Sequence, residues 1–203
     1  MDIILSTRNP SKAVQIQGCF EGSSIKILTL DDVGISGEAI EDGKTLEENA
    51  LKKALFAYEK SGKKAWVMSD DTGLFIRALN DEPGVYAARW AGESATTDEI
   101  TEHAIKKLSG ISDRRATFKT VVVVINPDGE TMFFSGEVHG NMQETPRVKP
   151  QPKMPYSPLF QPEGSDKVWA EMSTEEENAI SHRGIAFRQA REFLEKLIQL
   201  AQS

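Results

Sequence analysis

The pattern of apolar and polar positions divides the first third of the chain into alternating strands and helices. Short, apolar runs rich in β-branched residues at 2–6 and 25–30 predict two buried strands. Residues 10–20 begin with proline, which favours the first position of a helix. Residues 45–62 are rich in strong helix formers and end at a glycine, so they predict a second helix.

The middle of the chain carries the clearest β pattern. Residues 64–80 predict a short strand, a turn at Asp70–Gly73 and a second extended run. Residues 96–110 predict a helix capped by threonine and ended by glycine. Residues 115–140 form two extended runs around Asn126–Gly129, a composition that is typical of a β-hairpin.

The last third begins with a segment that is rich in proline. Six of the nine prolines lie within residues 143–162, so we expect an irregular loop there, and such loops often have a function. Ser181 predicts the N-cap of a long C-terminal helix with one apolar stripe. Strands alternate with helices before the hairpin, which indicates one α/β domain with a mixed sheet over residues 1–203.

Composition narrows the class of protein. The net charge of −7 argues against binding to nucleic acid, although a local basic pocket can still take a small anion. The only cysteine is Cys19, which excludes an intrachain disulfide. No run approaches the ~18 apolar residues of a membrane span. We therefore expect a cytoplasmic protein that binds neither nucleic acid nor membranes.

The first candidate site is the segment STRNPSK, residues 6–12. Asn9 is a preferred N-cap, and the start of a helix offers amide groups and a dipole to an anion. Lys12 lies in the first turn, where a cation is unfavourable unless an anion offsets it. On spacing alone, a capped turn with an exposed lysine is the alternative.

Two acidic segments and one basic segment are further candidates. Glu48 matches a capping box with Thr45 but is also a hard-oxygen ligand for magnesium. Asp70 and Asp71 are either turn formers or carboxylates at the carboxyl end of a strand, where α/β sheets place their sites. His182 begins the C-terminal helix together with an arginine, a placement that calls for an anionic or electron-rich partner unless both side chains point into solvent.

These segments, in this order, resemble the inosine triphosphate pyrophosphatase family, whose members act on noncanonical purine nucleoside triphosphates. The matching motifs are Thr7, Asn9 and Lys12 in T-x-N-x-x-K, Glu48-Asn49-Ala50, Asp70-Asp71-Thr72-Gly73, Pro83-Gly84 with Tyr86 and Arg89, and Asn178 to Gly184. The resemblance implies an elongated, strongly twisted mixed sheet flanked by helices, with an active-site cleft between two lobes. It also implies a homodimer.

The resemblance further implies magnesium-dependent cleavage between the α and β phosphates of substrates such as ITP, dITP and XTP, with Mn²⁺ as a possible substitute. Glu48, Asp70 and Asp71 would hold the metal, and Asp71 would deprotonate the attacking water. The predicted substrate contacts are Thr7, Arg8, Asn9, Lys12, Thr72, Met154, Tyr156, Ser157, Glu177, His182 and Arg183.

The chain departs from the family pattern on the side of the base. Met154 stands where the family has a stacking phenylalanine, Ser157 where it has aspartate, and Glu177 where it has lysine. These departures keep two alternatives open. One is the same chemistry on a different, standard or modified, nucleotide, and the other is a nucleotide-binding protein with weak catalysis.

Overall fold

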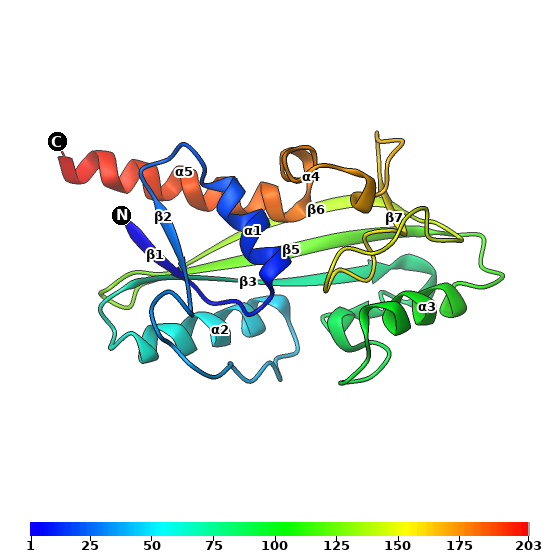
Figure 1. Ribbon diagram of the computed structural model, residues 1–203, viewed down its shortest axis with the longest axis horizontal. Helices are drawn as coiled ribbons and strands as arrows, with labels where there is room; N and C mark the ends of the chain where they lie inside the picture. The colour runs from blue at the N-terminus through cyan, green and yellow to red at the C-terminus, as the bar shows by residue number, and fades with distance from the viewer. Residues whose placement is uncertain (203) are drawn as a thin grey trace.

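The computed structural model describes residues 1–202 and confirms an α/β fold around one mixed, seven-stranded sheet (Figure 1). The strands are β1 (Asp2–Leu5), β2 (Lys26–Thr29), β3 (Trp66–Ile76), β4 (Pro83–Gly84), β5 (Arg115–Ile125), β6 (Thr131–Met142) and β7 (Phe160–Pro162). Their order is β2-β1-β3-β5-β6-β7, and β4 pairs with β3 outside this path. Among the described strands, only the pairs of β1 with β2 and with β3 are parallel.

Helices cover both faces of this sheet. They are α1 (Pro10–Cys19), α2 (Leu46–Lys60), α3 (Thr97–Lys107), α4 (Thr174–Ile180) and α5 (His182–Gln202), with the 3₁₀ helices η1 (Arg77–Leu79), η2 (Ala87–Arg89) and η3 (Trp169–Glu171). In Figure 1, α4 and α5 lie above the sheet, and α2 and α3 lie below it. In the described part of the chain, no helix has the length and apolar character needed to cross a membrane.

The core has three hydrophobic clusters. Two of them lie in one lobe of the molecule, and the third lies in the other lobe. One cluster packs α1 and α5 against β1, β3 and β5, and a second packs α2 against the opposite face of the same strands. The third cluster lies at the far ends of β3 and β5, where it joins them to α3, η3 and the proline-rich loop. The two lobes therefore share the long strands β3 and β5.

An open stretch of strand edge lies where the lobes meet. β5 pairs with β3 along Val67–Ile76, but the other edge of β3 pairs with β1 only at Trp66–Met68 and with β4 only at Leu74–Phe75. Among the described strands, none covers this edge at residues 69–73. Side chains alternate along a strand, so residues from both faces of the sheet can reach one cavity at this opening.

The structure corrects one predicted element and adds another. The predicted turn at Asp70–Gly73 is wrong, because these residues form the middle of the continuous strand β3, in register with Val122 to Lys119 of β5. Helix α4 was not predicted. The hairpin around Asn126–Gly129 is confirmed, and the Oγ atom of Ser181 caps α5 by accepting from the amide of Gly184.

The proline-rich loop is irregular, as predicted, until residues 160–162 pair with β6. Several hydrogen bonds fasten it to distant elements, of which three join it to α1, α3 and η2. Ser11 Oγ donates to the carbonyl of Pro152 (2.8 Å), and Thr101 Oγ1 donates to that of Pro155 (2.7 Å). Tyr156 Oη donates to the carbonyl of Ala87 (2.7 Å). The loop therefore spans the opening between α1, α3 and η2.

Candidate active site

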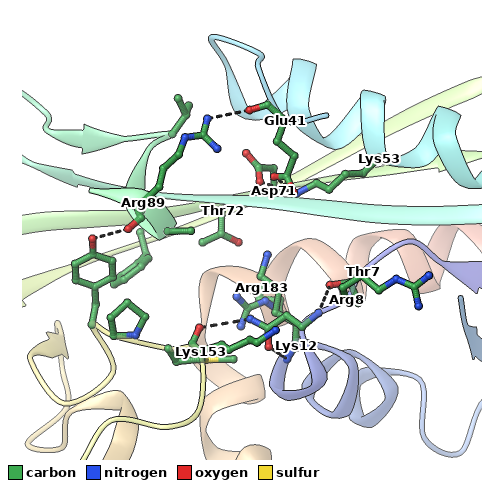
Figure 2. Close-up of a pocket in the computed structure, with 18 of the residues that line it drawn as sticks. Thr7, Arg8, Lys12, Glu41, Lys53, Asp71, Thr72, Arg89, Lys153 and Arg183 are labelled. Atoms are coloured by element: carbon green, nitrogen blue, oxygen red, sulfur yellow. Dashed lines mark hydrogen bonds and ion pairs between the residues drawn. The ribbon is translucent and has the colours of Figure 1, made fainter. Parts of the chain in front are cut away.

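A cavity of about 350 Å³ opens beside the uncovered edge of β3. Figure 2 shows Lys12, Lys53, Asp71 and Arg183 converging there from α1, α2, β3 and α5. The charged end of this pocket comprises Lys12, Glu41, Lys53, Asp70 and Asp71. The aromatic end comprises Phe118, Tyr156, Trp169 and His182. Among these residues all but Asp70 line the cavity.

Asp70 holds two cations in place at the charged end. Lys12 Nζ donates to Asp70 Oδ2 (2.8 Å), and Arg183 Nε lies 3.8 Å from the same oxygen. Burial opposes ionisation of Asp70, but the charges of Lys12 and Arg183 outweigh it and hold the pKa of this carboxyl well below its usual range. Burial lowers the pKa of Lys12, and repulsion from Lys53 and Arg183 adds to the lowering. An anionic ligand beside Lys12 would relieve that repulsion.

Asp71 points to the opposite face of the sheet and meets α2. Lys53 Nζ donates to Asp71 Oδ1 (2.7 Å) and to Glu41 Oε2 (3.0 Å), and Asn49 Nδ2 donates to Asp71 Oδ2 (3.3 Å). Burial raises the pKa of Asp71, which Lys53 offsets only in part. Asp71 is therefore a stronger base than an exposed aspartate, and it is held at both oxygens.

The carboxylates that could hold a divalent cation are Asp71 and Glu41. The ammonium of Lys53 lies between them, so the structure already stabilises positive charge at this point. Mg²⁺ is commonly bound by one or two carboxylates with substrate phosphates completing the shell, and two hard-oxygen donors facing the pocket fit that arrangement.

The predicted trio of metal ligands does not come together. Asp70 and Asp71 are neighbours on a strand, so their side chains lie on opposite faces, and Asp70 is occupied by Lys12. Glu48 Oε2 accepts from the amide of Lys44 (2.6 Å) at the start of α2, and Glu48 does not line the pocket. The described residues contain no group of three histidine, cysteine or acidic side chains arranged to hold a metal.

Thr7, Arg8, Asn9 and Lys12 line the pocket, but the contacts of this segment differ from the expectation. Asn9 caps α1, as predicted, and its Oδ1 accepts from the amides of Ser11 (3.0 Å) and Lys12 (3.2 Å). These two amides were expected to hold phosphate and are already satisfied. Arg8 donates to Asp31 and to carbonyls of the loop that follows β2, so it fastens that loop. Lys12 therefore carries most of the attraction for an anion from this segment.

The aromatic end contains buried polar atoms without partners. His182 stacks on Phe118 with ring centroids 4.8 Å apart, and burial lowers its pKa well below the usual value. Both ring nitrogens of His182 and Nε1 of Trp169 are buried without a hydrogen-bond partner among the described residues. A neutral imidazole has one donor and one acceptor, so a ligand with polar edges could satisfy both.

The remaining predicted contacts also line the pocket, mostly with their polar atoms engaged. Ser157 Oγ donates to the carbonyl of Met154 (2.8 Å), and Tyr156 is fastened to η2 as described above. Thr72 Oγ1 is 2.8 Å from Thr120 Oγ1 of β5. Glu177 is only 3% exposed, and burial raises the pKa of its carboxyl group, although the charge of Arg183 opposes this. The loop thus contributes Lys153, Met154, Pro155, Tyr156 and Ser157 to the lining of the cavity.

Comparison with known proteins identifies the family. Residues 3–193 match the sequence profile of the Ham1 family. The chain is 39% identical to the dITP/XTP pyrophosphatase of Thermoanaerobacter pseudethanolicus over 201 residues, 98% of this chain and 99% of that protein. It is 37% identical to the dITP/XTP pyrophosphatase of Geobacter sulfurreducens over 186 residues, 91% of this chain and 92% of that protein.

Comparison with solved structures points to the same family. The Staphylococcus aureus Ham1 protein superposes with a TM-score of 0.82 at 33% identity, covering 97% of this chain and 99% of that one. A HAM1 protein from Coxiella burnetii gives a TM-score of 0.82 at 32% identity, covering 98% of each chain. The chain belongs to the Ham1 family. This result confirms the resemblance that the ordered motifs indicated.

The pocket residues of this Ham1-family chain that were missing from the predicted site include Glu41, Lys53 and Arg89 at the charged end and Phe118 and Trp169 at the aromatic end. Arg89 Nη2 donates to the carbonyl of Glu41 (2.9 Å) and so fastens the loop that carries it (Figure 2). A signal for Lys53 was present, because it and Asn49 are polar residues four apart on the otherwise apolar inner face of α2. Glu41 lies in a loop without hydrophobic periodicity, so no sequence pattern could predict that its side chain lies in the pocket.

Proposed function

We propose that the protein is a magnesium-dependent pyrophosphatase that hydrolyses noncanonical purine nucleoside triphosphates, such as ITP, dITP and XTP, to the monophosphate and pyrophosphate. The observation that carries the proposal is one pocket with two unlike ends. Lys12, Lys53 and Asp71 meet at the charged end, and His182 stacks on an aromatic ring at the other. The names of relatives that are 37–39% identical support the same assignment.

In this proposal, the charged end binds the triphosphate. Lys12 and Lys53 bring two ammonium groups to the phosphate oxygens, where negative charge builds up as a phosphoanhydride bond breaks. Asp71, with its raised pKa, accepts the proton of the attacking water, and Asn49 helps to fix the orientation of its carboxylate. A magnesium ion held by Glu41 and Asp71 would supply Lewis-acid stabilisation of the phosphoryl oxygens.

The aromatic end binds the base. His182 and Arg183 offer N–H donors to the 6-oxo group of a purine, whereas the 6-amino group of adenine would leave those buried donors unpaired. This difference favours ITP over ATP, because a buried polar group without its partner is costly.

The test is pyrophosphate release from ITP, dITP, XTP and ATP, with Mg²⁺, with Mn²⁺ and after chelation. We expect kcat/KM for ITP to exceed that for ATP by roughly a hundredfold or more, and chelation to abolish turnover. Equal turnover of ATP and ITP would contradict the assignment of the aromatic end as the site that binds the base. Turnover that survives chelation would contradict the proposed dependence on magnesium. The homodimer stays a prediction, which ultracentrifugation of the same sample checks.

A further inference from the structure

We propose that Lys153, in the proline-rich loop, binds the triphosphate of the substrate with a positive charge that no carboxylate of the described chain balances. This inference rests on the proposed function, since it adds a substrate-binding residue to the same site. Lys153 was not among the contacts that the sequence predicted. The inference gives the loop a role in holding the phosphates, whereas the aromatic end holds the base.

The cations that line the cavity carry the first part of the argument. Among the described residues, every lysine and arginine of the lining except Lys153 forms an ion pair with a carboxylate. The paired cations are Arg8, Lys12, Lys53, Arg89 and Arg183. An anion that pairs with the ammonium of Lys153 therefore breaks no ion pair that the described residues form. The charge of Lys153 is available to a ligand.

The backbone around Lys153 carries the second part. Its φ angle is 58°, in the left-handed region that glycine adopts readily and that a residue with a Cβ atom adopts at a cost. The carbonyl of Lys153 accepts from Asn9 Nδ2 (3.4 Å), and the carbonyl of Pro152 accepts from Ser11 Oγ (2.8 Å). These two bonds hold the turn against the start of α1, the segment that also carries Lys12.

The chemistry of the ammonium group decides which part of the substrate it binds. Lysine has three hydrogen-bond donors and no acceptor, and its compact charge suits phosphate oxygens. Lys12 and Lys53 line the same cavity (Figure 2), but each shares its charge with a carboxylate, so they neutralise a triphosphate only in part. The hypoxanthine base of ITP is uncharged. We therefore assign Lys153 to the triphosphate and not to the base.

The other interpretation is that Lys153 is only a solvated side chain. It is exposed, and its left-handed backbone would then be a feature of the turn without a role in binding. Lys63 is the internal standard for that case, because it is an exposed lysine with a φ angle of 61° outside the cavity lining. The two interpretations differ in whether changes at Lys153 affect ligand affinity as changes at Lys63 do not.

The first experiment measures affinity for ITP, inorganic tripolyphosphate and inosine by calorimetry with Mg²⁺, in an Asp71→Asn background that prevents turnover. We expect Lys153→Met to weaken the binding of ITP and of tripolyphosphate about tenfold each, and that of inosine less than twofold. Lys153→Arg keeps the charge, so both affinities should stay within about threefold of the parent. Unchanged affinity for ITP and tripolyphosphate, or equal weakening of inosine, would overturn the proposal.

The second experiment measures kinetics and stability in the otherwise wild-type protein. In Lys153→Gly we expect Tm to stay level or rise, KM for ITP to rise about tenfold and kcat to change less than threefold, because glycine tolerates this backbone and the lost contact is one of binding. Lys63→Gly, the matched backbone control, should leave KM unchanged. Lys149→Met, at an exposed lysine of the same loop outside the lining, should do the same. A lower Tm with an unchanged KM in Lys153→Gly would show that this lysine serves the fold instead.

Binding separates this inference from the function on which it rests. If the wild-type protein releases no pyrophosphate but Lys153→Met weakens the binding of tripolyphosphate, the proposed hydrolysis is wrong and the role of Lys153 stands. If ITP is hydrolysed with the same KM by wild type and Lys153→Met, the hydrolysis stands and the role of Lys153 is wrong. If the wild type binds neither ITP nor tripolyphosphate, both are wrong.

Discussion

The two ends of the pocket differ in how their polar groups are satisfied. At the charged end each ammonium has a carboxylate partner within 3.0 Å, Lys12 with Asp70 and Lys53 with both Asp71 and Glu41. At the aromatic end, both nitrogens of His182 are buried without partners in the described part of the structure. The cations Lys12 and Lys53 of the charged end are therefore held in place by the protein itself, whereas the imidazole of the aromatic end leaves bonds for a ligand to complete.

Because of this difference, we expect mutations at the two ends of the pocket to have different effects. A change at the charged end removes one partner of a buried ion pair, so it affects folding as well as binding. A change at the aromatic end alters which ligand satisfies the unpaired groups, so it affects selectivity more than folding. The following variants test this contrast, beginning with the largest expected effect.

Asp71→Asn removes the carboxylate that we propose as the general base, while it keeps the shape of the side chain. We expect kcat for ITP to fall by roughly 10²–10⁴-fold, because an amide cannot accept the proton of the attacking water. Pyrophosphate release gives the rate, and circular dichroism checks folding. Asp98→Asn, an exposed change at the start of α3, is the matched control. A loss below tenfold would remove Asp71 from the chemistry.

Lys12→Ala tests whether one residue both binds the substrate and stabilises the protein. Asp70 has 1% of its side chain exposed, and removing Lys12 leaves Arg183 at 3.8 Å as its nearest cation. We expect unfolding to cost about 3 kcal/mol less and KM for the triphosphate to rise strongly. Denaturant unfolding and steady-state kinetics give the two quantities.

The control for this variant separates the two roles. A double change, Lys12→Met with Asp70→Asn, removes both charges, so we expect most of the stability to return while KM stays high. Lys64→Ala, at an exposed lysine, should alter neither quantity. If Lys12→Ala leaves stability unchanged, the ion pair with Asp70 is not an important part of the charged end.

The Lys12–Asp70 pair also shows where sequence reasoning succeeds and where it stops. Local features were predictable because they depend on neighbouring residues. Asn9 caps α1, Ser181 caps α5, and Asn126–Gly129 closes the hairpin, each as its composition indicates. The ordered motifs predicted the family, and all the predicted site residues except Glu48 and Asp70 line the pocket.

The rest depends on contacts between distant segments. Asp70–Gly73 reads as a turn, but pairing with β5 keeps it extended. The partner of Asp70 is 58 residues away, and Glu41 reaches Lys53 from a loop without periodicity. Sequence neighbours suggested that Asp70 and Asp71 share a metal, yet strand geometry sends them to opposite faces.

Met154→Phe tests whether a change beside the bound base alters substrate affinity without altering catalysis. Stacking of a base on an aromatic side chain contributes ~1–3 kcal/mol, so we expect KM for ITP to fall several-fold or more, with kcat nearly unchanged. Val148→Phe, in the same loop but outside the cavity lining, is the matched control. An equal fall of KM for ITP and for free triphosphate would show that the new ring does not contact the base.

Glu177→Gln gives the smallest effect, and its pH dependence has a definite sign. Burial raises the pKa of Glu177 above that of the unfolded chain, so the folded state favours the neutral carboxyl group. Below the unfolded value of ~4.3 both states are protonated and the residue has no net effect. As the pH rises from there through the folded pKa, ionisation increasingly destabilises the folded wild type, whereas Gln has no charge.

We therefore expect Tm of Glu177→Gln minus Tm of wild type to increase between pH 4 and pH 7, by about 2–4 °C for each kcal/mol. Calorimetry across this range measures it, with Glu175→Gln, at an exposed acidic residue of the same helix, as the flat reference. A difference that shrinks with rising pH would mean that the carboxylate stabilises the fold through Arg183, which would place Glu177 with the self-satisfied charged end and not with the groups that await a ligand.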